Sequence, residues 1–159
     1  MMIDREILLR ASKEYDSDKY SEELYAHCLD VLNNAHSVDN SLVESVINLL
    51  YWKLGKIKKR RTPKGKEISV SGLNSRYFLA GTTKSNLDAI SNATKSEILE
   101  QGIKFKNNTI EYEEFKGYAE RITRSSIVLP AYFVHIWRPD KYPIFDKNVW
   151  KKYRAEMGM

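Results

Sequence analysis

A broad apolar stripe in the segment 41–57 places the strongest constraint on how this chain folds. Its apolar residues recur every three to four positions, which is the spacing that brings side chains onto one face of an α-helix. The stripe consists of Val43, Val46, Ile47, Leu50 and Leu54, and it is widened by Leu42, Leu49 and Trp52. A stripe this wide is typical of a helix covered on several sides, so we expect it at the centre of a helical core.

The same helical spacing recurs elsewhere in the chain. A helix is expected to begin after Ser21, because the apolar residues that follow it share one face. "TKSE", which starts at Thr94, has the form of a capping box, so two short helices are expected near 85–91 and 95–101. Gly102 is then expected to end the second of them in a left-handed conformation. The apolar run 127–137 predicts a buried helix with Pro130 in its first turn.

The pattern predicts a single all-α domain over residues 1–159 with one irregular basic insert near 58–81. Hydrophobic residues make up 42% of the chain and charged residues 30%, which is a globular composition. The insert breaks the helical spacing and contains Pro63, Gly65, Gly72 and Gly81. A small hairpin is the alternative interpretation of this insert, because polar and apolar residues alternate briefly in "EISVSG", as they do in a strand.

Several functional classes are disfavoured by the composition. The longest apolar run has 11 residues, too few for a membrane span, so no membrane association is expected. Three histidines and one cysteine do not form a cluster at metal-ligand spacing, so we expect no metal site and no cofactor. Cys28 has no second cysteine with which to form an internal disulfide, and this fits a cytoplasmic location.

The positive charge of the chain is concentrated in one place. The formal net charge is +5, and the segment 53–66 holds eight basic residues without an acidic one. Such a run attracts phosphate groups and releases counterions when it binds them. The residues expected to contact nucleic acid here are Lys58, Lys59, Arg60, Arg61 and Lys64. The alternative interpretation is a solvated loop that maintains solubility.

A second signal lies near the C-terminus, in "RPDKYPIFDKNVWKKY". Pro143 excludes helix before it, and Asp146 follows two apolar residues at the start of an aromatic, basic segment. A carboxylate at this position can accept hydrogen bonds from the first free amides of a helix. From the residues alone, Asp146 is therefore interpreted as an N-cap.

The longer segment 125–149, "SSIVLPAYFVHIWRPDKYPIFDKNV", resembles the C-terminal half of the helix-hairpin-helix DNA glycosylase superfamily, and divergent members of it in particular. The resemblance implies that superfamily's helical fold, double-stranded DNA as the partner, and Asp146 as the catalytic acid. That acid would stabilise a cationic sugar or activate a nucleophile beside a flipped base.

The match also departs from the family in two ways. The glycine-rich hairpin that binds phosphate is absent, so we expect the Ser125 and Ser126 hydroxyls with Arg121 and Arg124 to replace it. Lys147, beside the acid, is a further candidate contact. Where bifunctional members carry a Schiff-base lysine, this chain has an apolar stretch at 127–129. The resemblance therefore implies at most a monofunctional glycosylase.

The candidate pocket residues are His135, Tyr132, Tyr142 and Trp150. The aromatic residues are among those near Asp146 in sequence and could stack on an extruded base, and His135 would lie one helix away from the acid. Each also has a structural interpretation: His135 as a core histidine bonded to a backbone carbonyl, and the aromatic residues as core.

Two functional hypotheses follow. The first is a base-excision enzyme, with Asp146 at the rim of a concave site and the basic run on the same side. The second is a non-catalytic nucleic-acid-binding or protein-interaction module that retains the scaffold.

Overall fold

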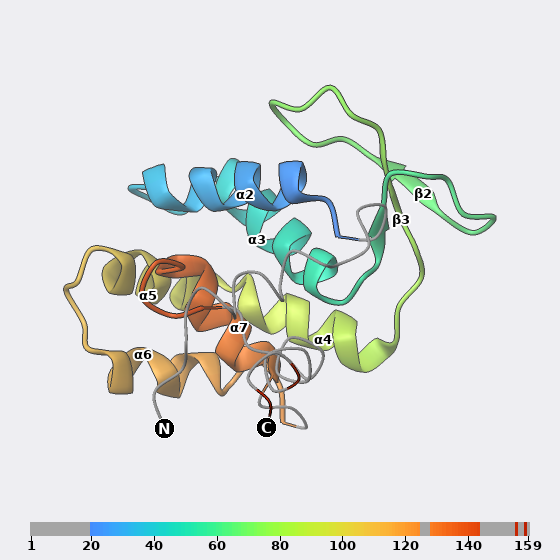
Figure 1. Ribbon diagram of the computed structural model, residues 1–159. Helices are drawn as coiled ribbons and strands as arrows, with labels where there is room; N and C mark the ends of the chain where they lie inside the picture. The colour runs from blue at the N-terminus through green and yellow to red at the C-terminus, as the bar shows by residue number, and fades with distance from the viewer. Residues whose placement is uncertain (1–19, 125–127, 144–154, 156–157, 159) are drawn as a thin grey trace.

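The computed structural model describes residues 20–124, 128–143, 155 and 158. These residues are mostly helical and include a small three-stranded antiparallel sheet (Figure 1). The predicted all-α class is therefore corrected to a mostly helical fold with a small sheet. Within the described ranges, the helices are too short or too polar to cross a membrane.

Helices α2 (Glu22–Asn34) and α3 (Asn40–Lys53) follow each other closely and pack together. Ser21 caps α2 as predicted, since its Oγ accepts a hydrogen bond of 3.3 Å from the Leu24 amide. The α3 helix starts after Asp39, which accepts from the Leu42 amide at 2.8 Å. It ends well before residue 57, because Gly55 adopts a left-handed conformation (φ 69°) that turns the chain.

The basic insert after α3 contains the sheet, so the prediction of an irregular segment is wrong at its strands. The strands are β1 (Ile57–Lys58), β2 (Lys66–Ile68) and β3 (Tyr77–Leu79), and β3 lies between the other two. Ile57 pairs with Leu79, and Glu67 pairs with Phe78. The sheet is attached to the helical core because Ile57, Tyr77 and Phe78 are buried.

The prediction of two short helices after the insert is confirmed by α4 (Lys84–Ala93) and α5 (Ser96–Lys106). The predicted capping box at Thr94 is wrong, because Thr94 belongs to the end of α4. Its hydroxyl donates to the Ile90 carbonyl at 3.0 Å, and α5 begins after Lys95 without a side-chain cap. A hydroxyl that bonds back to its own helix does not cap the next one.

The predicted helix stop at Gly102 is also wrong. Gly102 lies inside α5 against the Trp137 ring, and a Cβ atom there would be 2.2 Å from Trp137 Cε2. The helix ends instead at Lys106, and Asn108, two residues later, has the left-handed φ of 61°. The next amide, of Thr109, donates back to the Lys104 carbonyl at 2.8 Å. Asparagine thus supplies the conformation expected of the glycine.

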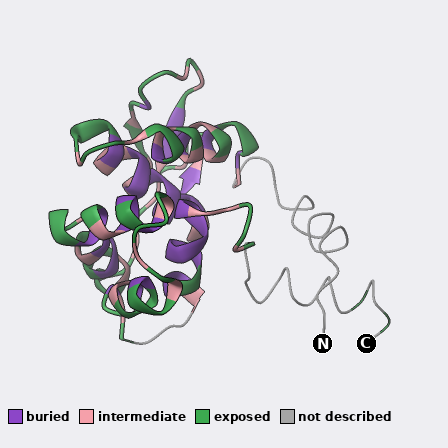
Figure 2. Ribbon diagram, turned by 90° about the vertical axis from the view of Figure 1, so that its left-hand side faces the viewer, coloured by how far each residue is buried: buried purple, intermediate pink, exposed green. Residues whose placement is uncertain are grey.

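Helix α7 (Val128–Trp137) passes through the helical core and contacts α2, α3, α5 and α6 (Tyr112–Ala119). Its predicted buried character is confirmed, since every residue from 132 to 137 is buried. Pro130 is the third residue of α7, where its missing N–H removes no intrahelical bond. Figure 2 shows the buried residues on the inner sides of the helices and the exposed ones outside.

Candidate nucleic-acid interface

The basic loop, residues 59–65 between β1 and β2, is the most strongly charged segment of the described surface. It projects beyond the helices at the right of Figure 1. Of the predicted contact residues, Lys59, Arg60, Arg61 and Lys64 are exposed, and Lys58 is half-buried at the end of β1, next to the loop. The structure therefore brings these five basic residues together on one projection.

The turn of the basic loop is held by local contacts rather than by packing. The Gly65 amide donates to the Thr62 carbonyl at 2.9 Å, and Pro63 lies between them. A Cβ atom on Gly65 would lie 2.7 Å from Thr62 Oγ1, so a larger residue there would make the Thr62 side chain rotate. The loop crosses from one edge strand to the other because β3 lies between them.

The acidic residue nearest in sequence to the loop is already paired. Arg76 donates from Nε and Nη2 to the two carboxylate oxygens of Glu67, at 2.9 and 3.0 Å. These hydrogen bonds, followed by the charges of Arg76 and Arg61, lower the pKa of Glu67. Glu67 therefore stays ionised and bound to Arg76.

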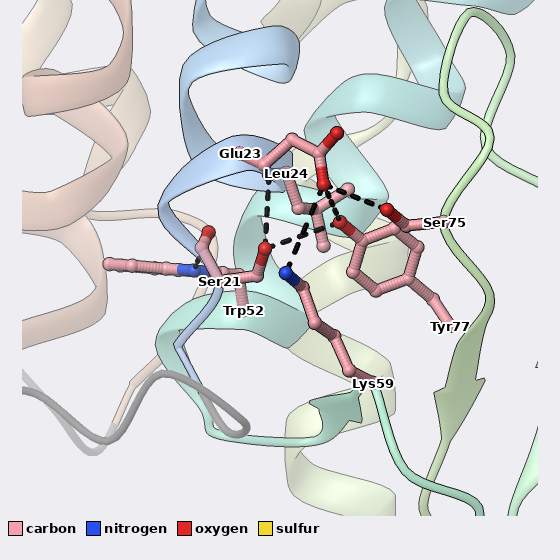
Figure 3. Close-up of polar contacts among 7 residues, drawn as sticks. All are labelled: Ser21, Glu23, Leu24, Trp52, Lys59, Ser75 and Tyr77. Atoms are coloured by element: carbon pink, nitrogen blue, oxygen red, sulfur yellow. Dashed lines mark hydrogen bonds and ion pairs between the residues drawn. The ribbon is translucent and has the colours of Figure 1, made fainter.

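A second carboxylate, Glu23 in the first turn of α2, lies at the foot of the basic loop (Figure 3). Its Oε2 atom accepts hydrogen bonds from Ser75 Oγ at 2.9 Å and Tyr77 Oη at 3.1 Å. Lys59 Nζ lies 3.9 Å from the same oxygen. The bond from Ser75, then that from Tyr77, and more weakly the charge of Lys59 lower the pKa of Glu23.

The hydroxyl of Tyr77 connects this cluster to the core. It lies 3.2 Å from Ser21 Oγ, and Trp52 Nε1 donates to the Ser21 carbonyl at 3.0 Å (Figure 3). Tyr77, Ser21 and Trp52 are all buried, so the foot of the loop rests on a rigid support.

The loop between β2 and β3, residues 69–76, lies against the helices. His27 Nε2 donates to the Ser71 carbonyl at 2.6 Å, and Glu44 accepts from the Ser71 amide and hydroxyl. Gly72 (φ 89°) lies directly over the His27 ring, where a Cβ atom would approach Cε1 to 2.7 Å. The β2–β3 loop is thus fixed to α2 and α3.

The candidate pocket residue His135 is 4% exposed, and both of its ring nitrogens have partners. Nδ1 donates to the Tyr142 carbonyl at 2.5 Å, and Nε2 accepts from the Tyr25 hydroxyl. Burial lowers the pKa of His135 to about 4, and the charge of Lys53 adds to this effect. His135 is therefore neutral at pH 7, with the contacts of the core-histidine interpretation.

The other described pocket candidates also make packing contacts. Tyr132 is 1% exposed, and its hydroxyl donates to the Leu49 carbonyl at 3.0 Å. Tyr142 is half-buried and stacks on Tyr112, with ring centroids 5.2 Å apart. Burial raises the pKa of Tyr132, so its phenol is neutral. These contacts leave Tyr132 no open ring face for a base.

The remaining predicted site residues divide into two groups. Arg124 is exposed in the connection after α6. The other predicted residues lie outside the described residues, and these are Asp146, Lys147, Trp150, Ser125 and Ser126. Their proposed roles stay predictions. Among the residues that are described, no group of three or more His, Cys, Asp or Glu could hold a metal ion.

Sequence reasoning missed Glu23, Ser75 and Tyr77. Glu23 is 52 residues from Ser75 and 54 residues from Tyr77 in the sequence, and only the folded sheet brings them together. Comparison with family models finds no match, and comparisons with curated proteins and with solved structures find no significant match either.

Proposed function

We propose that this protein binds double-stranded DNA through the basic loop. The observation that supports this proposal is the concentration of exposed cations on one projecting segment. Glu67 is bound to Arg76, and Glu23 accepts its hydrogen bonds from Ser75 and Tyr77 and pairs with Lys59 of the loop. Exposed lysines and arginines bind phosphate by charge and by directional hydrogen bonds, and they release counterions from the duplex when they do so.

Binding is tested with a labelled duplex and the triple variant Arg60→Gln, Arg61→Gln, Lys64→Gln. At about 100 mM salt we expect the affinity to fall about tenfold or more. The slope of log K against log salt concentration should also decrease by about 2 to 3, because each phosphate contact contributes about 0.9.

The matched control removes three exposed lysines, one in α4, one in the connection to α5 and one in α5: Lys84→Gln, Lys95→Gln, Lys104→Gln. It changes the net charge by the same amount at other positions, so the proposal expects little loss of affinity. An equal loss in both triple variants would mean that overall charge, and not the basic loop, governs binding. Salt-insensitive binding, or none, would favour a protein partner over DNA.

Base excision is the second activity that we propose, and it depends on Asp146. It is favoured by the order of apolar helix, proline-containing connection, Asp, Asn and Val in the sequence. The test is base release from duplexes that carry damaged or mismatched bases. We expect Asp146→Asn to lower the rate by about a hundredfold or more, as for loss of a catalytic acid or base.

Asp140→Asn is the control, because Asp140 is an exposed acid in the connection after α7. It should leave the rate of base release unchanged. DNA binding without base release from any duplex would support the non-catalytic alternative, in which the chain keeps a binding scaffold only.

A further inference from the structure

Two hydroxyl donors and one ammonium group from separate segments converge on one oxygen of Glu23. They are Ser75 Oγ from the β2–β3 loop at 2.9 Å, Tyr77 Oη from β3 at 3.1 Å, and Lys59 Nζ from the basic loop at 3.9 Å (Figure 3). One cation and two hydroxyls around a single anionic oxygen form the kind of donor set that proteins use for phosphate oxygens.

The donors are held in place independently of Glu23. Tyr77 is fully buried, and its hydroxyl has a second partner in Ser21 Oγ at 3.2 Å. Ser75 lies in the β2–β3 loop, which His27 and Glu44 fix to the helices. The donor geometry therefore does not require the carboxylate.

Glu23 itself is free to leave. Its side chain is 47% exposed, so it can rotate into water without opening the core. A second anion at the same donors would repel the carboxylate, and the two can therefore occupy the cluster only in turn.

We propose that Lys59, Ser75 and Tyr77 form an anion site that binds a phosphate group of the DNA backbone, and that the Glu23 carboxylate is its internal occupant. The phosphate source rests on the proposed function, whereas the anion site does not. In this arrangement a backbone phosphate displaces Glu23 and gains the three donors, and the carboxylate weakens DNA binding by competing for them.

The first test compares Glu23→Ala with Glu67→Ala. Both variants remove one negative charge beside the basic loop, but Glu67 binds Arg76 and lies outside the donor cluster. At about 100 mM salt, we expect Glu23→Ala to bind duplex DNA about three to ten times more tightly than Glu67→Ala does. Adding Ser75→Ala and Tyr77→Phe to Glu23→Ala should abolish this difference.

Glu23→Gln keeps an acceptor oxygen at the site and serves as the folding control. The affinity of Glu23→Gln for duplex DNA should lie between the affinities of the wild type and of Glu23→Ala, because a neutral amide is displaced more easily than a carboxylate. If Glu23→Ala does not fold, Glu23→Gln is compared with Glu67→Gln in its place. Equal gains for the substitutions at positions 23 and 67 would overturn the proposal, since charge alone would then explain them.

Inorganic phosphate is the second probe, and it separates this inference from the proposed function. Phosphate should raise the melting temperature of Glu23→Ala more than sodium chloride of equal ionic strength does, with a smaller effect on the wild type. That result in a protein that binds no DNA would retain the anion site and reject DNA binding. Phosphate stabilisation that is equal in Glu23→Ala and in Glu67→Ala would reject the anion site, even where DNA binds.

Discussion

The buried His135 imidazole forms hydrogen bonds with two protein groups in place of water, the Tyr142 carbonyl and the Tyr25 hydroxyl. The groups that face it are Tyr25, Tyr132, Tyr142 and Lys53, and none of these four is an acid that would favour a charged imidazole. Protonation would place a second donor against the Tyr25 hydroxyl in a buried site. The folded protein therefore keeps His135 neutral at pH values well below the ordinary pKa of histidine.

This environment predicts a loss of stability in mild acid. The unfolded chain binds a proton at His135 as the pH falls below 6.5, whereas the folded chain does so only near pH 4, because burial lowers the pKa of this group. Between these values the free energy of unfolding should fall by about 3 kcal/mol on account of His135, and no such loss occurs above pH 6.5.

His135→Gln removes the titration and keeps an amide for both partners. Urea denaturation at several pH values should show a much shallower decline for this variant between pH 6.5 and 4. Parallel declines for the variant and the wild type would mean that other groups, and not His135, cause the acid sensitivity.

The role of a single residue is hard to predict from the sequence when its partners come from distant parts of the chain. His135 has both a structural and a functional interpretation in the sequence, because its partners Tyr25 and Tyr142 come from different parts of the chain. Ser21 is predicted correctly as a cap because its acceptor role depends only on the next three residues. The cluster at Glu23 depends on the sheet and carries no local signal.

At the scale of helices, the crossing of α5 and α7 depends on Gly102. The Trp137 ring occupies the space of its missing side chain, so a methyl group has no room there. Gly102→Ala should therefore destabilise the protein by about 1 to 3 kcal/mol through overpacking, despite the better helix propensity of alanine.

Gly117→Ala is the matched control, because Gly117 lies within α6 and a Cβ atom added to it would meet no neighbour within 4 Å among the described residues outside its own helix backbone. It should raise the free energy of unfolding by up to about 1 kcal/mol. Chemical denaturation of both variants tests the opposite signs. A stable Gly102→Ala variant would show that Trp137 can move aside, and would contradict the close helix approach.

The elements differ in how well the sequence predicts them, for a physical reason. Helices α2 and α3 repeat their apolar positions over several turns, and the repeated pattern is readable without knowing the fold. The strands have two or three residues, too few for alternation to be distinguished from chance, and their pairing partners lie up to 22 residues away, as for Ile57 and Leu79. The end of α5 escapes prediction because Asn108 supplies a conformation expected of glycine.

At the scale of the whole molecule, the positive charge is separated from the core that stabilises the fold. The net charge is +5, and the cations of the basic loop lie on a projection that Lys59 joins to α2 through its ion pair with Glu23. Like charges on neighbouring residues repel each other, and salt screens this repulsion over about 10 Å at 0.1 M. DNA binding and folding stability should therefore respond to loop substitutions in opposite directions.

The triple variant Arg60→Gln, Arg61→Gln, Lys64→Gln tests this separation. At low salt we expect a melting temperature equal to or higher than that of the wild type, with a gain in stability of at most about 1 kcal/mol. The difference should vanish as salt is added, because the repulsion that it relieves is screened. Thermal denaturation at low and high salt measures it. If the variant lost stability at both salt concentrations, the loop cations would be part of the fold, and weaker DNA binding could then reflect unfolding instead of lost phosphate contacts.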